Sequence, residues 1–176
     1  MKKIFSLVFI GVLCFVLLGC TTNDEHVTSE GMIRVGNELL GYIDIPEGFS
    51  ITEGDVSILG HMTDMENLVE LSFGITIPWS AETLEEYLTS ENSLINQIRN
   101  NDINNITYDG PFSTNHISGH KIVYNTTRGI PIYSSRYIFE ANGNLIAISF
   151  YSTKLRSTSP VFLINDNLID TYRKDR

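Results

Sequence analysis

The 176-residue chain lacks several features that would point to a specific chemistry. Its two cysteines are Cys14 and Cys20, so residues 21–176 can form no disulfide, and cysteine catalysis or a cysteine metal site is excluded there. It has no Gly-x-Gly-x-x-Gly, P-loop or Gly-x-Ser-x-Gly pattern, which removes the usual signals for nucleotide binding and for one class of hydrolase. Basic residues are also few, 12 against 21 acidic ones, and this balance argues against nucleic acid as a partner.

The N-terminal residues carry the most specific signal in the chain. Met1-Lys2-Lys3 is a basic start, and the apolar run Ile4–Leu18 is shorter than the roughly 20 residues that a membrane-spanning helix needs. This order is typical of a secretory signal. The closing Leu17-Leu18-Gly19-Cys20 resembles the bacterial lipobox, in which the signal is removed before the cysteine. We therefore expect residues 1–19 to be a lipoprotein signal peptide; the alternative is an uncleaved anchor.

Lipidation at Cys20 would decide where the protein resides. Acyl chains such as palmitate on Cys20 would hold it on the extracytoplasmic side of the cell membrane. Thr21 to Gly31 is polar and unpatterned, as expected of a flexible tether. We assign residues 20–37 to the lipidated cysteine and tether, and residues 38–176 to one globular domain that starts between Met32 and Leu39.

Period-two alternation predicts strands in that domain. Leu68–Ile77 places Val69, Leu71, Phe73, Ile75 and Ile77 on one face. Strand-like runs on both sides of Asn142-Gly143, a strong signal for a type I′ turn, predict a hairpin. In the register that this turn sets, three cross-strand pairs share an apolar face: Phe139 with Ile146, Tyr137 with Ile148 and Ser135 with Phe150.

Two segments change to helical spacing. We predict a helix from about Ala81 to Arg99, with a break near Thr89-Ser90 as the alternative. Ser159-Pro160 is a helix start, and Ile164, Leu168 and Tyr172 follow it at a spacing of four. Strands joined by hairpins, with helices packed on them, form an α+β fold with an antiparallel sheet.

This order of elements resembles the Mog1/PsbP-like fold. The matching pieces lie within about residues 38–173: Gly41-Tyr42-Ile43-Asp44-Ile45-Pro46, the helix near Leu84–Ile98, Ile117-Ser118-Gly119-His120-Lys121, the Asn142-Gly143 hairpin and the terminal helix. The resemblance implies an α/β/α sandwich. It implies no activity, since members of this fold bind varied partners and most are not enzymes.

Residues that could carry chemistry are sparse. His116-x-x-x-His120 would face one ion on a helix, but Gly119 and the strand pattern place the two histidines about 13 Å apart at ~3.3 Å per residue. We therefore predict no metal site, no cofactor and no catalytic residue. The candidate contact surface for a ligand or partner is Lys121, Arg136 and Tyr151, which we expect together on the sheet face opposite the apolar pairs.

These observations favour a non-catalytic binding or accessory protein of the cell envelope. Its expected partners are the membrane, through the N-terminal lipid, and an envelope protein. The alternative is a small-molecule-binding module, which would show a concave apolar pocket with a few convergent polar groups. A hydrolase is less favoured and would need a close His–Ser or carboxylate pair in a cleft.

Overall fold

A computed structural model of the chain describes residues 30–175, except 67, 80, 127 and 155–165. The described residues form nine strands and three short helices. In chain order these are β1 Met32–Asn37, β2 Gly41–Pro46, β3 Ser50–Glu53, β4 Ser57–Asp64, β5 Val69–Thr76, α2 Leu84–Thr89, α3 Leu94–Arg99, β6 Asn104–Ser113, β7 Ser118–Thr126, β8 Ile132–Ala141, β9 Asn144–Lys154 and α4 Asp166–Ile169.

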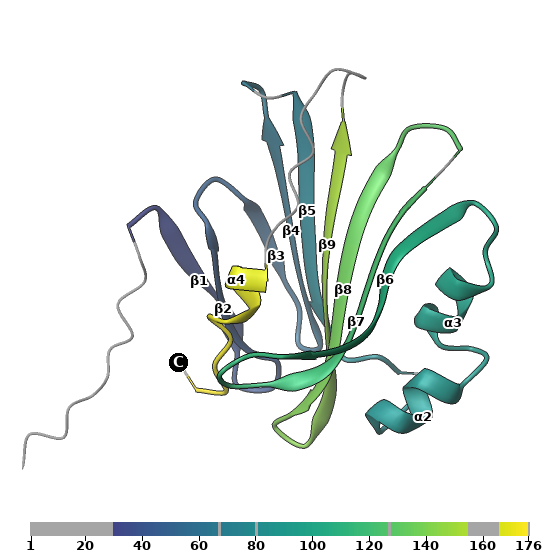
Figure 1. The fold of residues 1–176 in the computed structure, drawn as a ribbon. Helices are drawn as coiled ribbons and strands as arrows, with labels where there is room; N and C mark the ends of the chain where they lie inside the picture. The colour runs from purple at the N-terminus through teal and green to yellow at the C-terminus, as the bar shows by residue number, and fades with distance from the viewer. Residues whose placement is uncertain (1–29, 67, 80, 127, 155–165, 176) are drawn as a thin grey trace, which may run out of the picture.

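Seven strands form the central sheet, in the order β3-β4-β5-β9-β8-β7-β6, and each neighbouring pair is antiparallel. The strands β1 and β2 form a separate antiparallel pair. Figure 1 shows three layers, with β1, β2 and α4 on one side of the sheet and α2 and α3 on the other. The predicted α+β class with an antiparallel sheet is confirmed.

The hairpin of β8 and β9 has the predicted turn and register. Asn142 and Gly143 have φ values of 54° and 72°, the left-handed conformation that a type I′ turn requires at both central positions. The predicted pairs Phe139–Ile146, Tyr137–Ile148 and Ser135–Phe150 are all present. The two-residue turn therefore fixes which side chains of this long hairpin face the core.

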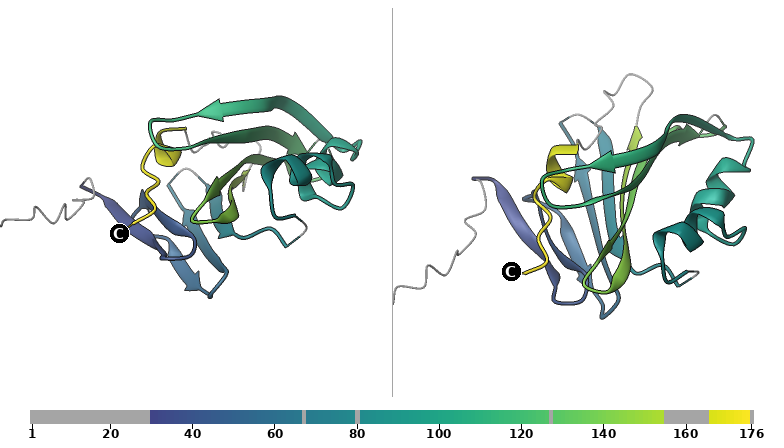
Figure 2. Two further views of the ribbon diagram at one scale, coloured as in Figure 1. Left: turned by 90° about the horizontal axis from the view of Figure 1, so that it is seen from below. Right: turned by 60° about the horizontal axis from the view of Figure 1, so that its bottom comes forward.

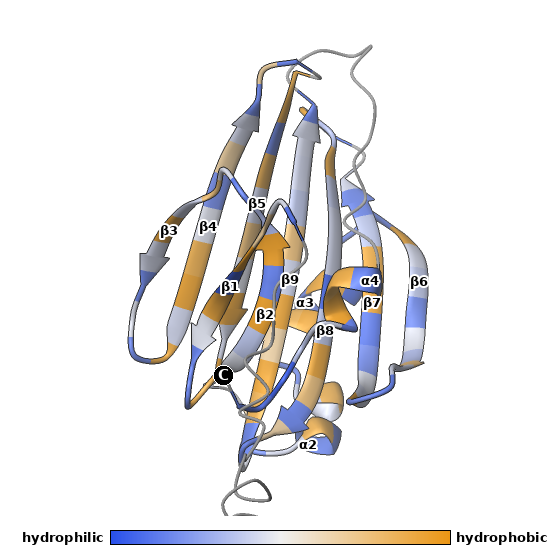
Figure 3. Cartoon of the chain, turned by 90° about the vertical axis from the view of Figure 1, so that its left-hand side faces the viewer, coloured by the Kyte–Doolittle hydropathy of each residue, from blue (hydrophilic) through white to orange (hydrophobic). Residues whose placement is uncertain are grey.

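The strand β5 shows how the sheet divides into two faces. Its large apolar residues point to the side of β1, β2 and α4 and are almost completely buried, while Glu70, Ser72, Gly74 and Thr76 point to the other side. We call the first side the covered face; its apolar strand residues are visible in Figure 3. The main core on this face includes Ile58, Val69, Leu71, Phe73, Ile75, Tyr137, Phe139, Ile146, Ile148 and Phe150.

The helices α2 and α3 cover only part of the opposite face. They enclose a second core, in which Tyr87, Ile95 and Ile98 pack against sheet residues such as Ile138 and Ala147. The single helix predicted over 81–99 is wrong and the alternative break is confirmed, because Ser90 closes α2 and Ser93 caps α3 through a bond to the Asn96 amide.

The strand β1 lies within the range that we assigned to the tether. Met32–Asn37 pairs with β2 along its whole length, so the last part of the range 20–37 is a strand. Two interactions explain the difference: Val35 is buried in the main core, and Arg34 forms a bidentate ion pair with Asp44 at 2.7 and 3.0 Å. A short strand stabilised by packing has no long periodic signal in its sequence.

The C-terminal segment closes the covered face. The predicted helix start at Ser159-Pro160 lies outside the described residues, and α4 ends at Ile169, so Tyr172 is not on a helix. Arg173 instead exchanges two backbone hydrogen bonds with Tyr42 of β2. Figure 2 shows the end of the β6–β7 hairpin beside α4, consistent with a shared hollow lined by Phe112 and Ile169.

Candidate functional site

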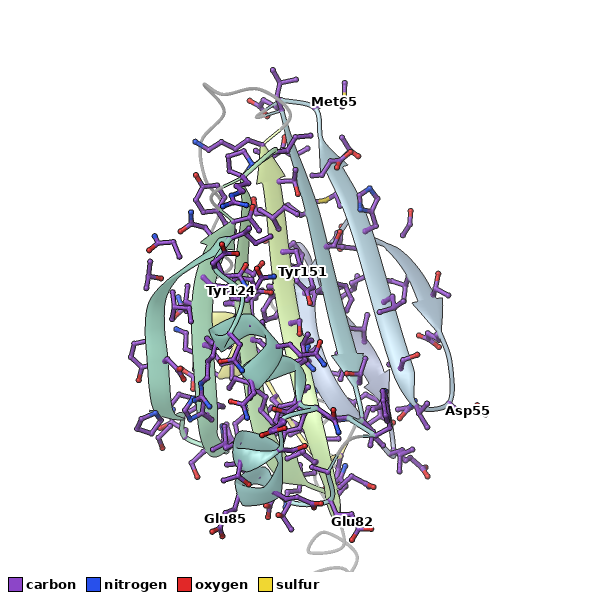
Figure 4. All side chains as sticks on the ribbon, turned by 90° about the vertical axis from the view of Figure 1, so that its right-hand side faces the viewer. Asp55, Met65, Glu82, Glu85, Tyr124 and Tyr151 are labelled. Atoms are coloured by element: carbon purple, nitrogen blue, oxygen red, sulfur yellow. The ribbon has the colours of Figure 1, made fainter. Side chains whose placement is uncertain are left out.

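A large part of the sheet face that carries α2 and α3 has no helix over it. Figure 4 shows this face, with the helices in front of β7 and β8 and with β5, β4 and β3 uncovered beside them. A hollow of about 370 Å³ lies over these strands and β9. Its lining includes Ser50, Leu59, His61, Ser72, Arg136 and Tyr151.

A second hollow, of about 440 Å³, lies between the end of β5 and the helices. Its walls include Val56, Trp79, Tyr87 and Leu94. Arg136 and Thr76 line both hollows, so the two adjoin at these residues. We call the two hollows together the open-face groove.

Arg136 occupies the central position in this groove. It extends from β8 and is 9% exposed. One terminal nitrogen donates to Ser149 Oγ at 2.8 Å, and the other donates to the Tyr87 hydroxyl at 3.3 Å. Its Nε–H is buried and has no hydrogen-bond partner among the described residues. The charge is therefore held between β9 and α2 by hydroxyl groups alone.

Two tyrosines lie near this arginine. Tyr151, which the sequence predicted on this face, lines the hollow of about 370 Å³. Tyr124 of β7 lies close to Tyr151 in Figure 4. Burial raises the pKa of Tyr124, and the neighbouring Arg136 charge acts in the opposite direction. The Tyr124 phenol therefore keeps its proton near pH 7.

Lys121 is not on this surface, so the expectation that it groups with Arg136 and Tyr151 is wrong. It pairs across β7 and β8 with Tyr137, which belongs to the main core on the covered face. Its ammonium lies 5.2 Å from the centre of the Tyr137 ring and 5.7 Å from that of Tyr108. The sequence does not define the length of the β7–β8 loop, so it leaves the register of β7 uncertain. A shift of one residue in that register moves every side chain of the strand to the opposite face of the sheet.

A histidine and a serine also meet in the groove. His61 Nδ1 lies 3.1 Å from Ser72 Oγ, across the β4–β5 pairing. A hydrolytic dyad needs a group that orients the histidine and donors for an oxyanion. No described carboxylate contacts His61, and Ser72 lies in mid-strand between β4 and β9, where backbone amides serve the sheet. The histidine–serine contact is therefore present, but the described residues supply neither the orienting group nor the oxyanion donors.

His120, the second histidine of the His116-x-x-x-His120 spacing, lies beside an aspartate and an arginine. His120 Nε2 contacts Asp109 Oδ1 at 2.6 Å, and Arg99 of α3 binds both oxygens of Asp109 at 2.7 and 2.8 Å. These contacts lower the pKa of Asp109, mainly through the Arg99 hydrogen bond. Within the described part of the chain, no group of three metal-ligating side chains occurs. The cluster fastens α3 to β6 and β7.

The predicted lipidation residue Cys20 lies outside the described residues. Among the helices that the structure describes, none combines the length and the apolar character needed to cross a membrane.

Sequence reasoning missed several residues of the groove. Trp79 and Val56 are apolar but 94% and 56% exposed, and Tyr87 lies within the segment that was predicted only as a helix over 81–99. A usable signal was the run of small and polar residues that alternates with the apolar side of β5: Ser72, Gly74 and Thr76. Such a run permits a hollow, but it does not reveal that α2 and α3 stop short of it.

No protein-family model matches the chain, and no curated protein matches its sequence. Solved structures that are similar include a Pseudomonas aeruginosa protein of unknown function, with 13% identity, coverage of 70% of this chain and 83% of that one, and a TM-score of 0.45. Another is the cyanobacterial PsbP of Synechocystis, with 13% identity, coverage of 77% and 87%, and a TM-score of 0.46. Human StAR-related lipid transfer protein 5 has 14% identity, coverage of 70% and 78%, and a TM-score of 0.29. These likenesses concern the arrangement of elements and carry no conclusion about activity.

Proposed function

We propose that the protein is a lipid-anchored cell-envelope protein that binds a small molecule, without catalysis, in the open-face groove. The observation that carries this proposal is the pair of adjoining hollows around Arg136. A ligand site is typically a concave, mainly apolar hollow with a few convergent polar groups. The open-face groove is concave and mainly apolar and has a few polar groups around Arg136. A surface that docks an envelope protein does not require such a hollow.

Crosslinking in intact cells tests what occupies the groove. A benzoylphenylalanine at Leu59, on the groove wall and 51% exposed, is expected to capture a low-mass adduct on irradiation. The same photoreactive group at Ile130, which is 66% exposed and outside the groove lining, is the matched control. Mass spectrometry of the protein would identify the adduct. A protein captured at position 59 would support the accessory role instead, and equal adducts at both positions would contradict a groove-specific ligand.

The membrane anchor is a separate part of the proposal. Replacing Cys20 by Ser removes the sulfur that would carry the acyl chains, so we expect an unprocessed and unlipidated precursor. Gel mobility and mass spectrometry of membrane fractions would measure both changes. A Cys20→Ser variant with the normal mature mass, extracted from membranes like the wild type, would contradict the anchor.

A hydrolase remains the second candidate because of the contact between His61 and Ser72. Under the proposed function, the protein has no esterase activity that depends on this pair. Hydrolysis of p-nitrophenyl acetate by the full chain, abolished in Ser72→Ala and retained in Ser90→Ala, would replace the proposal with catalysis.

A further inference from the structure

The arginines of the described chain differ in how their charge is balanced. Arg34 and Arg99 each make a bidentate pair with an aspartate, and Arg128 lies 3.6 Å from Asp102. Arg136 is the most buried of these four and has no carboxylate partner among the described residues. Taking a guanidinium out of water without a counter-charge is costly, so the Arg136 side chain is suited to pair with an anion that enters from solvent.

The hydrogen-bond inventory of Arg136 leaves room for that anion. A guanidinium has five N–H groups in a fixed fork, and the bonds to Ser149 and Tyr87 use two of them. The remaining donors belong to a side chain that lines both hollows, and Nε–H has no described partner. A carboxylate that enters the groove can accept from the terminal N–H groups that these two bonds leave unused.

The groove is free of negative charge although the chain has 21 acidic residues. No Asp or Glu lines either hollow among the described residues. In Figure 4 Glu82 and Glu85 lie at the lower end of the fold and Asp55 lies at its right-hand edge, all three away from Tyr124 and Tyr151. An anion in either hollow therefore meets the positive charge of Arg136 and no carboxylate in the described lining.

The walls beside Arg136 are apolar and exposed. Val56, Trp79 and Leu94 line one hollow, and Leu59 lines the other. Solvent-exposed apolar side chains that gather beside one buried charge suit an amphiphilic ligand better than a bare inorganic ion.

We infer that the open-face groove binds a monocarboxylate with an apolar or aromatic body, and that Arg136 holds its carboxylate. The inference rests on the proposed function and names its ligand class. A single permanent cation matches a single negative charge, and the planar guanidinium fork matches a planar carboxylate. The apolar body lies against Trp79 and Leu94, and the hydroxyls of Tyr87 and Ser149 keep the guanidinium in place.

Trp79 gives the assay, because it is the single tryptophan of the chain, it is 94% exposed and it lines the groove. The full chain, reconstituted in phosphatidylcholine vesicles, is titrated with 4-phenylbutyrate, and with 4-phenylbutanol as the uncharged match. We expect a saturable blue shift of the tryptophan emission with the carboxylate and a much weaker response to the alcohol. Phenyl phosphate, as a dianion, tests whether the site prefers a carboxylate to a phosphate.

Two variants test the role of Arg136 in different ways. Arg136→Gln removes the charge and should weaken binding at least about tenfold. Ser149→Asp keeps the arginine but places a carboxylate where Ser149 Oγ already accepts its hydrogen bond, so it should block binding without loss of thermal stability. Lys121→Met, which removes a cation on the covered face, is the control and should bind normally. Circular dichroism confirms that each variant is folded.

The outcomes separate this inference from the proposed function. Binding of 4-phenylbutyrate that Arg136→Gln weakens at least about tenfold and that Ser149→Asp blocks supports the inference. Equal affinity for the alcohol, tighter binding of phenyl phosphate, unchanged binding in the folded Ser149→Asp variant, or no saturable response overturns it. The crosslink at position 59 then decides independently whether the groove holds another kind of small molecule.

Discussion

The two faces of the sheet differ in how completely they are covered. We call the face that carries α2, α3 and the groove the open face. On β5, Leu71, Phe73 and Ile75 are at most 7% exposed on the covered face, whereas Ser72 and Gly74 line a hollow on the other. The first face is filled by β1, β2, α4 and the C-terminal segment, and the second only in part by α2 and α3. One strand thus contributes alternate residues to the stability of the fold and to its candidate binding site.

The contrast suggests that substitutions have opposite consequences on the two faces. Changes on the covered face alter the free energy of unfolding, because side chains there are close-packed. Changes at exposed residues of the open-face groove leave the free energy of unfolding nearly unchanged and alter binding instead. Three pairs of variants test this division.

The largest expected effect is the loss of an aromatic side chain from the covered face. Phe139 is fully buried and packs edge-on against Tyr172, with ring centres 4.8 Å apart. Phe139→Ala should lower the free energy of unfolding by about 3–5 kcal/mol. Leu59→Ala on the open face, where the side chain is 51% exposed, should change it by less than about 1 kcal/mol. Urea denaturation measures both; similar losses would contradict the division.

Two glycines on neighbouring strands, one on each face of the sheet, should differ by a smaller amount in unfolding free energy when each is replaced by alanine. A methyl group on Gly60 would lie 2.0 Å from the Phe73 ring, which is buried and has nowhere to move. On Gly74 it would meet the tip of Leu59 at 3.2 Å. Gly60→Ala should cost about 1–3 kcal/mol of unfolding free energy, and Gly74→Ala should be neutral or slightly stabilising. Thermal unfolding followed by circular dichroism distinguishes them, and a larger loss for Gly74→Ala would reverse our assignment of the faces.

The smallest expected effect concerns the boundary of the open face, where Asp109 fastens α3 to the sheet. Asp109→Asn should lower the free energy of unfolding by about 1–2 kcal/mol at neutral pH. Because the pKa of Asp109 is lowered in the folded state, its contribution is complete above the ordinary value of 3.8 and is lost as the pH falls through the folded value.

The difference between wild type and Asp109→Asn should therefore shrink below about pH 4. Urea denaturation across this pH range gives the measurement. Asp102→Asn is the control, because Asp102 is 82% exposed and its nearest cation is 3.6 Å away. A pH-independent difference would mean that Asp109 acts through packing rather than charge.

Sequence periodicity was sufficient for the elements whose register is fixed locally. The Asn142-Gly143 turn set the β8–β9 pairing residue by residue, and alternation on β5 identified the buried side. It failed where a register depended on a loop, as for Lys121, or where tertiary contacts stabilise a short element, as for β1. Arg136 and Tyr151 were placed on a common face, but the groove around them arises from where α2 and α3 end, and no local pattern encodes that limit.

The bonds between β2 and the last residues of the chain bear on the order of synthesis. The Asp44 amide donates to Thr171, 127 residues later, and the Tyr172 hydroxyl donates to the Leu40 carbonyl, 132 residues earlier. The ribosome makes β1 and β2 before the sheet strands that they pack against and before residues 171 and 172. These two hydrogen bonds can form only after residues 171 and 172 have been synthesised. They join residues that are 127 and 132 positions apart, and contacts between such distant residues form slowly. The β1–β2 hairpin is synthesised before the other described strands and helices, yet it is among the last to complete its contacts.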